Sequence, residues 1–127
     1  MLQKAIYVSC AKANDMEKER NGTIPAAKAA NLAGMVDYQE DSIVSRTLID
    51  KEVGTVTLFA FDANQSLSEH TAPFDALLHV FEGEAEVTIS GKPIQLKAGM
   101  IVLLPAGKPH AVKALSQFKM ILIMIRA

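Results

Sequence analysis

The chain has no tryptophan and one cysteine, Cys10, among its 127 residues. A single cysteine excludes a disulfide within the chain, and its apolar surroundings predict a buried, unreactive thiol. Long apolar runs are also missing, because the longest, Met120–Ile125, is far shorter than the roughly 18 residues that a membrane span needs. The amino-terminal sequence lacks the cleavage site of a secretory signal peptide. We therefore expect a cytoplasmic protein that has no membrane partner.

No excess of one charge is present either, since the formal net charge is −1 at pH 7. Lysines occur singly between apolar residues, which is typical of a solvated face and not of a nucleic-acid surface. The glutamates Glu82, Glu84 and Glu86 are expected to be solvated as well. The sequence contains neither a Ser-His-Asp or Cys-His nucleophile pattern nor a phosphate-binding loop. Nucleic acid is thus excluded as an expected partner.

Half of the residues are hydrophobic, which is enough for one domain with a sizeable core. Residues 42–127 contain short β-rich runs separated by turns, the pattern of an antiparallel sandwich or barrel. In the run 84–89, Ala85, Val87 and Ile89 alternate with polar residues. The predicted strands cover residues 43–49, 54–62, 76–83, 84–91, 93–96, 100–105, 110–115 and 118–125. These runs do not include residues 63–75, a segment that begins turn-like and contains His70.

Residues 1–41 differ from the rest because they are rich in alanine and mixed in character. Two short helices are predicted there, over residues 14–22 with Asn14 as the cap and over residues 23–34 with Thr23 as the cap. We therefore divide the chain into a partly helical amino-terminal appendage, residues 1–41, and a β-domain, residues 42–127.

The stretch GMIVLLPAGKPHAVKA, residues 99–114, carries glycine, proline, glycine and histidine in the spacing G-x5-P-x-G-x2-H. It resembles the second motif of the cupins, with Gly99, Pro105, Gly107 and His110 in place and Ala114 where the family has asparagine. The resemblance implies an all-β fold, the double-stranded β-helix or jelly-roll barrel of that family.

The first cupin motif, G-x5-H-x-H-x3,4-E-x6-G, is degenerate in this chain. His70 and Gly83 are retained, whereas Ala72 stands at the second histidine and Ala76 at the glutamate. Asn64 replaces the opening glycine, and asparagine tolerates the left-handed backbone that such a position needs.

Metal-binding cupins hold iron, manganese, nickel or zinc through three histidines and one glutamate, and the resemblance leaves His70 and His110 for that role. Two imidazoles alone bind a divalent metal weakly, since catalytic zinc sites use about three protein ligands. Asp75 and His79 are the candidates for a third ligand. Alternation argues against both, because it turns His79 away from the inner face and makes Asp75 a rim residue that accepts backbone hydrogen bonds.

We expect His70 and His110 to lie on facing strands and to share a pocket. Strand alternation adds apolar walls to this pocket and places Lys119 on the outer face. Such a cavity suits a small, partly apolar ligand oriented by a few polar groups. The predicted pocket residues are His70, Ala72, Ala76, Leu78, His110, Phe118, Met120 and Met124.

Three functions remain open from the sequence. The first is binding of a small molecule in the barrel, with or without a weakly held divalent metal. The second is a metal-dependent enzyme of the dioxygenase or isomerase type that uses His70 and His110. The third is a non-catalytic dimerising module.

Several strands are apolar on both faces, so we expect a homodimer in which residues 4–10 add or exchange a strand.

Overall fold

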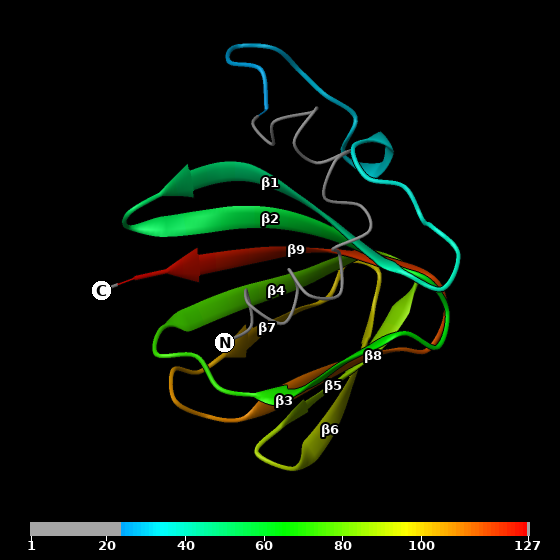
Figure 1. Ribbon diagram of the computed structural model, residues 1–127, viewed down its shortest axis with the longest axis vertical. Helices are drawn as coiled ribbons and strands as arrows, with labels where there is room; N and C mark the ends of the chain where they lie inside the picture. Colours follow the sequence, from blue (N-terminus) through cyan, green and yellow to red (C-terminus); the bar gives the residue numbers. More distant parts are fainter. Residues whose placement is uncertain (1–23, 127) are drawn as a thin grey trace.

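The computed structural model describes residues 24–126, which form two antiparallel β-sheets folded into a barrel (Figure 1). The strands are β1 (Ile43–Lys51), β2 (Gly54–Phe61), β3 (Ser66–His70), β4 (Asp75–Glu82), β5 (Glu84–Ile89), β6 (Lys92–Lys97), β7 (Ile101–Leu104), β8 (His110–Ala114) and β9 (Phe118–Ile125). One sheet has the order β1-β2-β9-β4-β7, and the other has the order β3-β8-β5-β6. The predicted all-β jelly-roll fold is confirmed.

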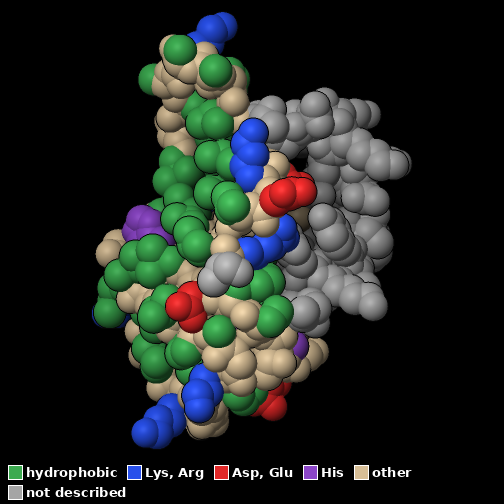
Figure 2. Space-filling view, turned by 90° about the vertical axis from the view of Figure 1, so that its left-hand side faces the viewer, with side chains coloured by type: hydrophobic (Ala, Val, Ile, Leu, Met, Phe, Trp, Pro, Cys, Tyr) green, Lys and Arg blue, Asp and Glu red, His purple; other side chains and the backbone are tan. Residues whose placement is uncertain are grey.

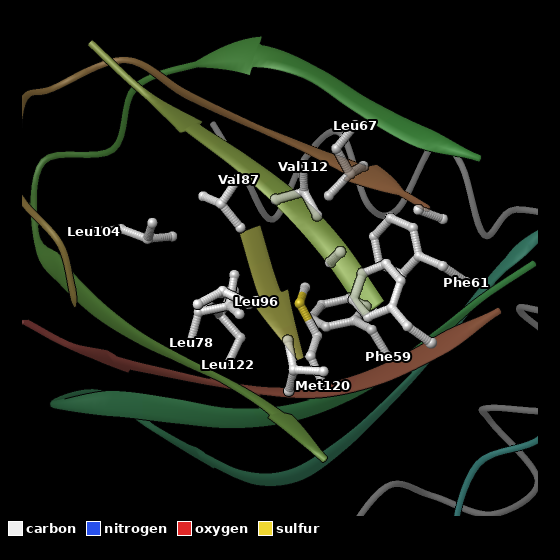
Figure 3. Packing of buried hydrophobic residues seen from close by; sticks show 14 of the residues in the cluster. Phe59, Phe61, Leu67, Leu78, Val87, Leu96, Leu104, Val112, Met120 and Leu122 are labelled. Atoms are coloured by element: carbon white, nitrogen blue, oxygen red, sulfur yellow. The ribbon is translucent and has the colours of Figure 1, made fainter. Parts of the chain in front are cut away.

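The space between the sheets is filled by apolar side chains from the inner face of every strand. Figure 3 shows Leu104 toward one end of this core and Phe61 toward the other. Phe61 stacks on Phe118 with the ring centroids 4.5 Å apart, and Phe59 meets Phe61 edge-on at 6.4 Å. Period-two alternation therefore produces the core as predicted, because every second side chain of a strand points to the same face.

Strand β3 lies in a segment that the predicted strand-like runs do not include. Leu67 is its only apolar residue, and this side chain is 3% exposed in the core. The strand is defined by its pairing with β8, where Ser66 lies opposite Lys113 and Leu67 opposite Val112. An edge strand with one buried side chain has too little alternation to be recognised from sequence.

The α-helix predicted over residues 23–34 is absent from residues 24–34. Only Leu32–Gly34 form a short 3-10 helix, η2. Ala27 has a φ of 60°, in the left-handed region that interrupts an α-helix. The side chains of residues 24–31 are exposed, so no packing supports a helix there. The helix predicted over residues 14–22 lies outside the described residues.

No helix within residues 24–126 has the length and apolar character required to cross a membrane.

Residues 32–38, here called the strap, cover part of the outer face of the five-stranded sheet. Val36 of the strap is 4% exposed and belongs to a second apolar cluster with Val44 and Leu58 of β1 and β2. Arg46 of β1 donates a hydrogen bond through Nη1 to the carbonyl of Met35 at 3.1 Å. The strap therefore gives this half of the sheet a second layer.

Lys119 of β9 lies beneath the strap, so the prediction that it is solvated is wrong. Its side chain is 7% exposed, and Nζ donates to the carbonyl of Ala33 at 2.6 Å. Nζ is also 3.8 Å from Oε2 of Glu82 and 5.0 Å from the ring centre of Tyr38. The Tyr38 hydroxyl donates to the same Glu82 oxygen at 2.5 Å. Burial and the Glu82 carboxylate raise the pKa of Tyr38, which keeps this donor neutral.

Replacing Lys119 with methionine should lower the free energy of unfolding by about 1–3 kcal/mol. The variant keeps the apolar stem but loses the hydrogen bond from a charged, buried donor to the Ala33 carbonyl, and hydrogen bonds from charged groups are among the stronger ones. Urea denaturation measures the change. Lys113→Met is the matched control, because Lys113 is exposed on β8 and its loss should cost less than about 0.5 kcal/mol. Equal effects of the two substitutions would contradict the role of Lys119 in holding the strap.

Candidate functional site: the His70–His110 pair

His70 ends β3 and His110 begins β8, and the two residues lie opposite one another in the strand pairing. Their ring centroids are 4.6 Å apart, and the ring planes meet at 68°. The sequence predicts facing strands for the pair, whereas the structure places it on neighbouring strands of the same sheet. The reason is that β3 pairs directly with β8. This pairing could not be predicted because β3 was not among the predicted strands.

An irregularity in β3 turns His70 toward the inside of the barrel. Leu67 pairs with Val112 and His70 pairs with His110, so three steps along β3 match two along β8. This extra residue is a β-bulge, which changes the alternation of a strand by one position. Leu67 and His70 can therefore share the inner face although their numbers differ by an odd count.

Two hydrogen bonds hold the loop that leads into His110. The amide of Ala106 donates to Oδ1 of Asp75 at 2.8 Å, and the amide of Gly107 donates to the carbonyl of Ala72 at 2.8 Å. Gly107 has a φ of 77°, which a glycine adopts without strain. Asp75 thus lies at the rim and accepts a backbone hydrogen bond, and Ala72 contributes its carbonyl to the same connection.

Each histidine ring is held by a backbone carbonyl two residues before it. Nδ1 of His70 is 2.6 Å from the carbonyl oxygen of Ser68, and Nδ1 of His110 is 3.3 Å from that of Lys108. A carbonyl oxygen only accepts, so Nδ1 carries the proton in both neutral rings. Nε2 of each ring is buried and has no hydrogen-bond partner within residues 24–126. No sequence signal announces this arrangement, because every residue has a carbonyl.

The surroundings of both rings favour the neutral form. Burial lowers the pKa of His70, and burial together with the neighbouring His70 ring lowers the pKa of His110. His110 is 2% exposed, whereas His70 is only half-buried. The pair therefore presents two uncharged nitrogen acceptors, and His70 is the ring nearer to solvent.

The remaining predicted pocket residues lie beside the pair or deeper in the barrel. Ala72 is buried near the rim, and the others contribute to the packed core. His79 lies on the outer face of β4, opposite Ile101 and Ile121, as alternation predicts. The predicted pocket residues found in the core cluster are Ala76, Leu78, Phe118, Met120 and Met124.

A resident metal centre does not fit the donors that the structure brings together. Within residues 24–126, no group of three or more histidine, cysteine, aspartate or glutamate side chains is placed to hold a metal ion. Asp75 is engaged with the Ala106 amide, and His79 is on the opposite face of the sheet. Only the two Nε2 atoms remain as ligands, fewer than the roughly three that catalytic zinc sites use.

Acidification should destabilise the metal-free protein through these two rings. Their native pKa values lie below the ordinary value of 6.5, so the unfolded chain binds more protons as the pH falls below it. The stability that the neutral rings provide is present above about pH 6.5 and is lost as the pH falls toward their lowered values.

The measurement is the urea midpoint across this pH range in the presence of a chelator. The double variant His70→Gln/His110→Gln should show a flatter pH dependence than the wild-type chain. An unchanged slope in the double variant would contradict this assignment.

Residues 57–126 match the cupin domain family. The chain belongs to the cupins. No curated protein matches it. The family assignment agrees with the motif glycines of this chain, since Gly83, Gly99 and Gly107 all have positive φ values. Asn64, in place of the opening glycine of the first motif, has a φ of 70°, which confirms that it substitutes in the left-handed region.

Solved structures with this fold come from several bacteria. A conserved protein of unknown function from Streptococcus pyogenes is 32% identical, with a TM-score of 0.79, and the alignment covers 83% of this cupin and 92% of that chain. A cupin superfamily protein from Desulfitobacterium hafniense is 28% identical, with a TM-score of 0.78 and coverage of 83% and 96%.

A Cupin 2 conserved barrel domain protein from Leptotrichia buccalis is 43% identical, with a TM-score of 0.74. The alignment covers 76% of this cupin but only 47% of that chain, so the match spans about half of the Leptotrichia protein.

Proposed function

We propose that this cupin binds a small molecule at the rim of its barrel through His70 and His110. The observation that carries the proposal is that Nε2 of both histidines is buried without a hydrogen-bond partner. The centroids of the two rings are 4.6 Å apart. A buried polar atom that lacks a hydrogen bond costs about 1–3 kcal/mol. A ligand that donates hydrogen bonds to both atoms would remove this cost.

The surroundings of the pair favour a ligand that is small and partly apolar. Ile89 of β5, a partly buried residue that packs against the core, lies opposite His110. The half-buried His70 ring leaves the pair within reach from the rim. A few polar groups in an apolar setting are typical of small-molecule sites.

A divalent metal is the second candidate ligand, because neutral imidazole nitrogen is a metal donor. With two protein ligands, we expect weak binding that decreases at low pH as the rings become protonated. The arrangement favours no particular reaction, so this cupin is proposed as a binding protein and not as a metal-dependent enzyme.

The test measures the melting temperature of untagged protein in the presence of small neutral compounds and, separately, of zinc or nickel. A ligand of the native state raises this temperature with concentration, and His70→Ala should abolish the shift while the barrel stays folded. His79→Ala is the matched control on the outer face. Ligand shifts that persist in His70→Ala would place the binding elsewhere and contradict the proposal.

We also propose that the cupin forms a homodimer through an outer apolar patch on β9, β4 and β7, defined by Leu77, Ile101, Leu103, Ile123 and Ile125. Leu77 lies opposite Leu103 on one side and Ile123 on the other, so the patch is continuous across the strands. Ile101, Leu103 and Ile125 are 55%, 51% and 60% exposed.

Two features of the outer apolar patch favour a second copy as the partner. Figure 2 shows hydrophobic side chains gathered along the left side of that view around a histidine. The patch residues carry no charge, so the same surface on a second chain meets no like-charge repulsion, as a two-fold interface requires. Strand β7 is also an edge of its sheet, and exposed edges tend to pair.

Light scattering at micromolar concentration tests the dimer. The wild-type chain should have twice the monomer mass, and Leu103→Lys should be monomeric because a charge would be buried without a partner. Lys113→Glu, on the other sheet, should leave the mass unchanged. A monomeric wild-type chain would overturn the proposal and would point to cover of the patch by another part of the chain.

A further inference from the structure

The proposed binding site has an unusual polarity, which its hydrogen bonds determine. Nδ1 of His70 and Nδ1 of His110 each donate to a backbone carbonyl, of Ser68 and Lys108 respectively. A neutral imidazole has one N–H group, so each ring has used its donor. What remains on each ring is the lone pair of Nε2, and both lone pairs are buried without a partner.

The backbone holds this state in both rings in the same way. In each case the carbonyl belongs to the residue two positions earlier, on the strand β3 or on the loop before β8. The loop before β8 is itself held by Asp75 and by the Ala72 carbonyl. Rotating either ring to present an N–H would therefore break its hydrogen bond to the carbonyl.

Resting on the proposed binding function, we infer that the His70–His110 pair selects ligands that donate hydrogen bonds, such as primary amides or vicinal hydroxyls, and discriminates against carboxylates. A ligand with two such donors, one for each ring, satisfies both Nε2 lone pairs. A carboxylate offers only acceptors, so its oxygens would face two buried lone pairs with no proton between them. Burying an unpaired acceptor is costly, which makes the discrimination large for a small site.

The discrimination is opposite to that of an anion site built on arginine or on a helix amino terminus, where N–H groups point toward the ligand. The residue types alone cannot distinguish the two cases, because a histidine can donate, accept or do both. The two backbone carbonyls decide between them. The substrate class thus follows from the tautomer and not from the identity of the side chains.

The experiment uses full-length protein labelled with nitrogen-15 in histidine, at neutral pH with a chelator present. Two probe pairs of nearly equal shape are titrated, acetamide against acetate and benzamide against benzoate. The imidazole nitrogen resonances report the tautomer directly and report ligand contact at Nε2. We expect protonated Nδ1 in both rings, and we expect the amides to shift the Nε2 resonances with roughly tenfold or greater preference over the acids.

Variants separate this inference from general binding. His110→Gln replaces the fixed acceptor with an amide that both donates and accepts, so the preference for amides should fall toward parity. His79→Gln changes the outer face alone and should leave the response of His70 and His110 as in the wild-type chain.

The possible outcomes separate the two proposals. Protonated Nε2 in either ring, or tighter binding of the acids, would overturn the donor-selective site while leaving the proposed binding function in place. If neither member of either probe pair perturbs the two rings, the binding function and the inference built on it both fail.

Discussion

Replacing Phe61 with alanine should lower the free energy of unfolding by about 3–5 kcal/mol, the range of large-to-small changes at buried aromatic residues. Phe61 is fully buried (0% exposed), stacks on Phe118 at 4.5 Å and meets Phe59 edge-on at 6.4 Å. Its loss removes apolar contact and leaves a cavity between rings that come from β2 and β9. Urea denaturation followed by circular dichroism measures the change.

Phe61→Leu is the matched control, since it keeps most of the apolar volume and should cost clearly less than the alanine variant. The leucine variant also keeps the comparison possible if Phe61→Ala does not fold. A loss below about 1 kcal/mol in the alanine variant would show that the three phenylalanines do not anchor the core.

Gly83→Ala should be nearly as damaging, with a loss above about 3 kcal/mol, because two separate costs coincide at this position. Gly83 joins β4 to β5 with a φ of 78°, which an L-residue adopts only under strain. A methyl group there would also lie 2.0 Å from the carbonyl oxygen of Gln117 and 2.8 Å from Cα of Phe118. These atoms belong to the backbone before and within β9, so they cannot move without displacing a central strand of the five-stranded sheet.

Gly91→Ala isolates the first of these costs. Gly91 has a φ of 82°, but a methyl group there meets nothing within 4 Å, so only the backbone strain of about 1–2 kcal/mol applies. The difference between the two variants, measured by thermal or urea denaturation, is the cost of the clash. Equal losses at Gly83 and Gly91 would contradict the close approach of the β4–β5 turn to β9.

The His70–His110 site was predictable from the sequence only in part. The motif spacing pointed to His70 and His110, because the turn residues around them have backbone requirements that few residues satisfy. Their mutual arrangement was not predictable. It depends on the bulge in β3 and on the pairing of β3 with β8. A bulge adds one residue to a strand and has no characteristic residue type here that would reveal it in the sequence.

The strap shows the same limit on the outer face. Alternation placed Lys119 correctly on the outer side of β9 and then predicted contact with water. Alternation reports only the face of a sheet, and it carries no information about what packs on that face. Ala33 of the strap, which accepts a hydrogen bond from Lys119, is 86 positions away from it in the sequence. The contacts of Lys119 with Ala33, Glu82 and Tyr38 therefore exist only in the folded chain.

The sequence by itself determined most of the core side chains and the positive φ of Asn64 and the motif glycines, because these follow from local alternation and from the backbone limits of each residue type. Tertiary structure alone decided the chemistry of the site. The proton of each imidazole is assigned by the carbonyls of Ser68 and Lys108, and the neutral state follows from burial. Carbonyls are common to all residues, so only the fold selects which of them a histidine meets.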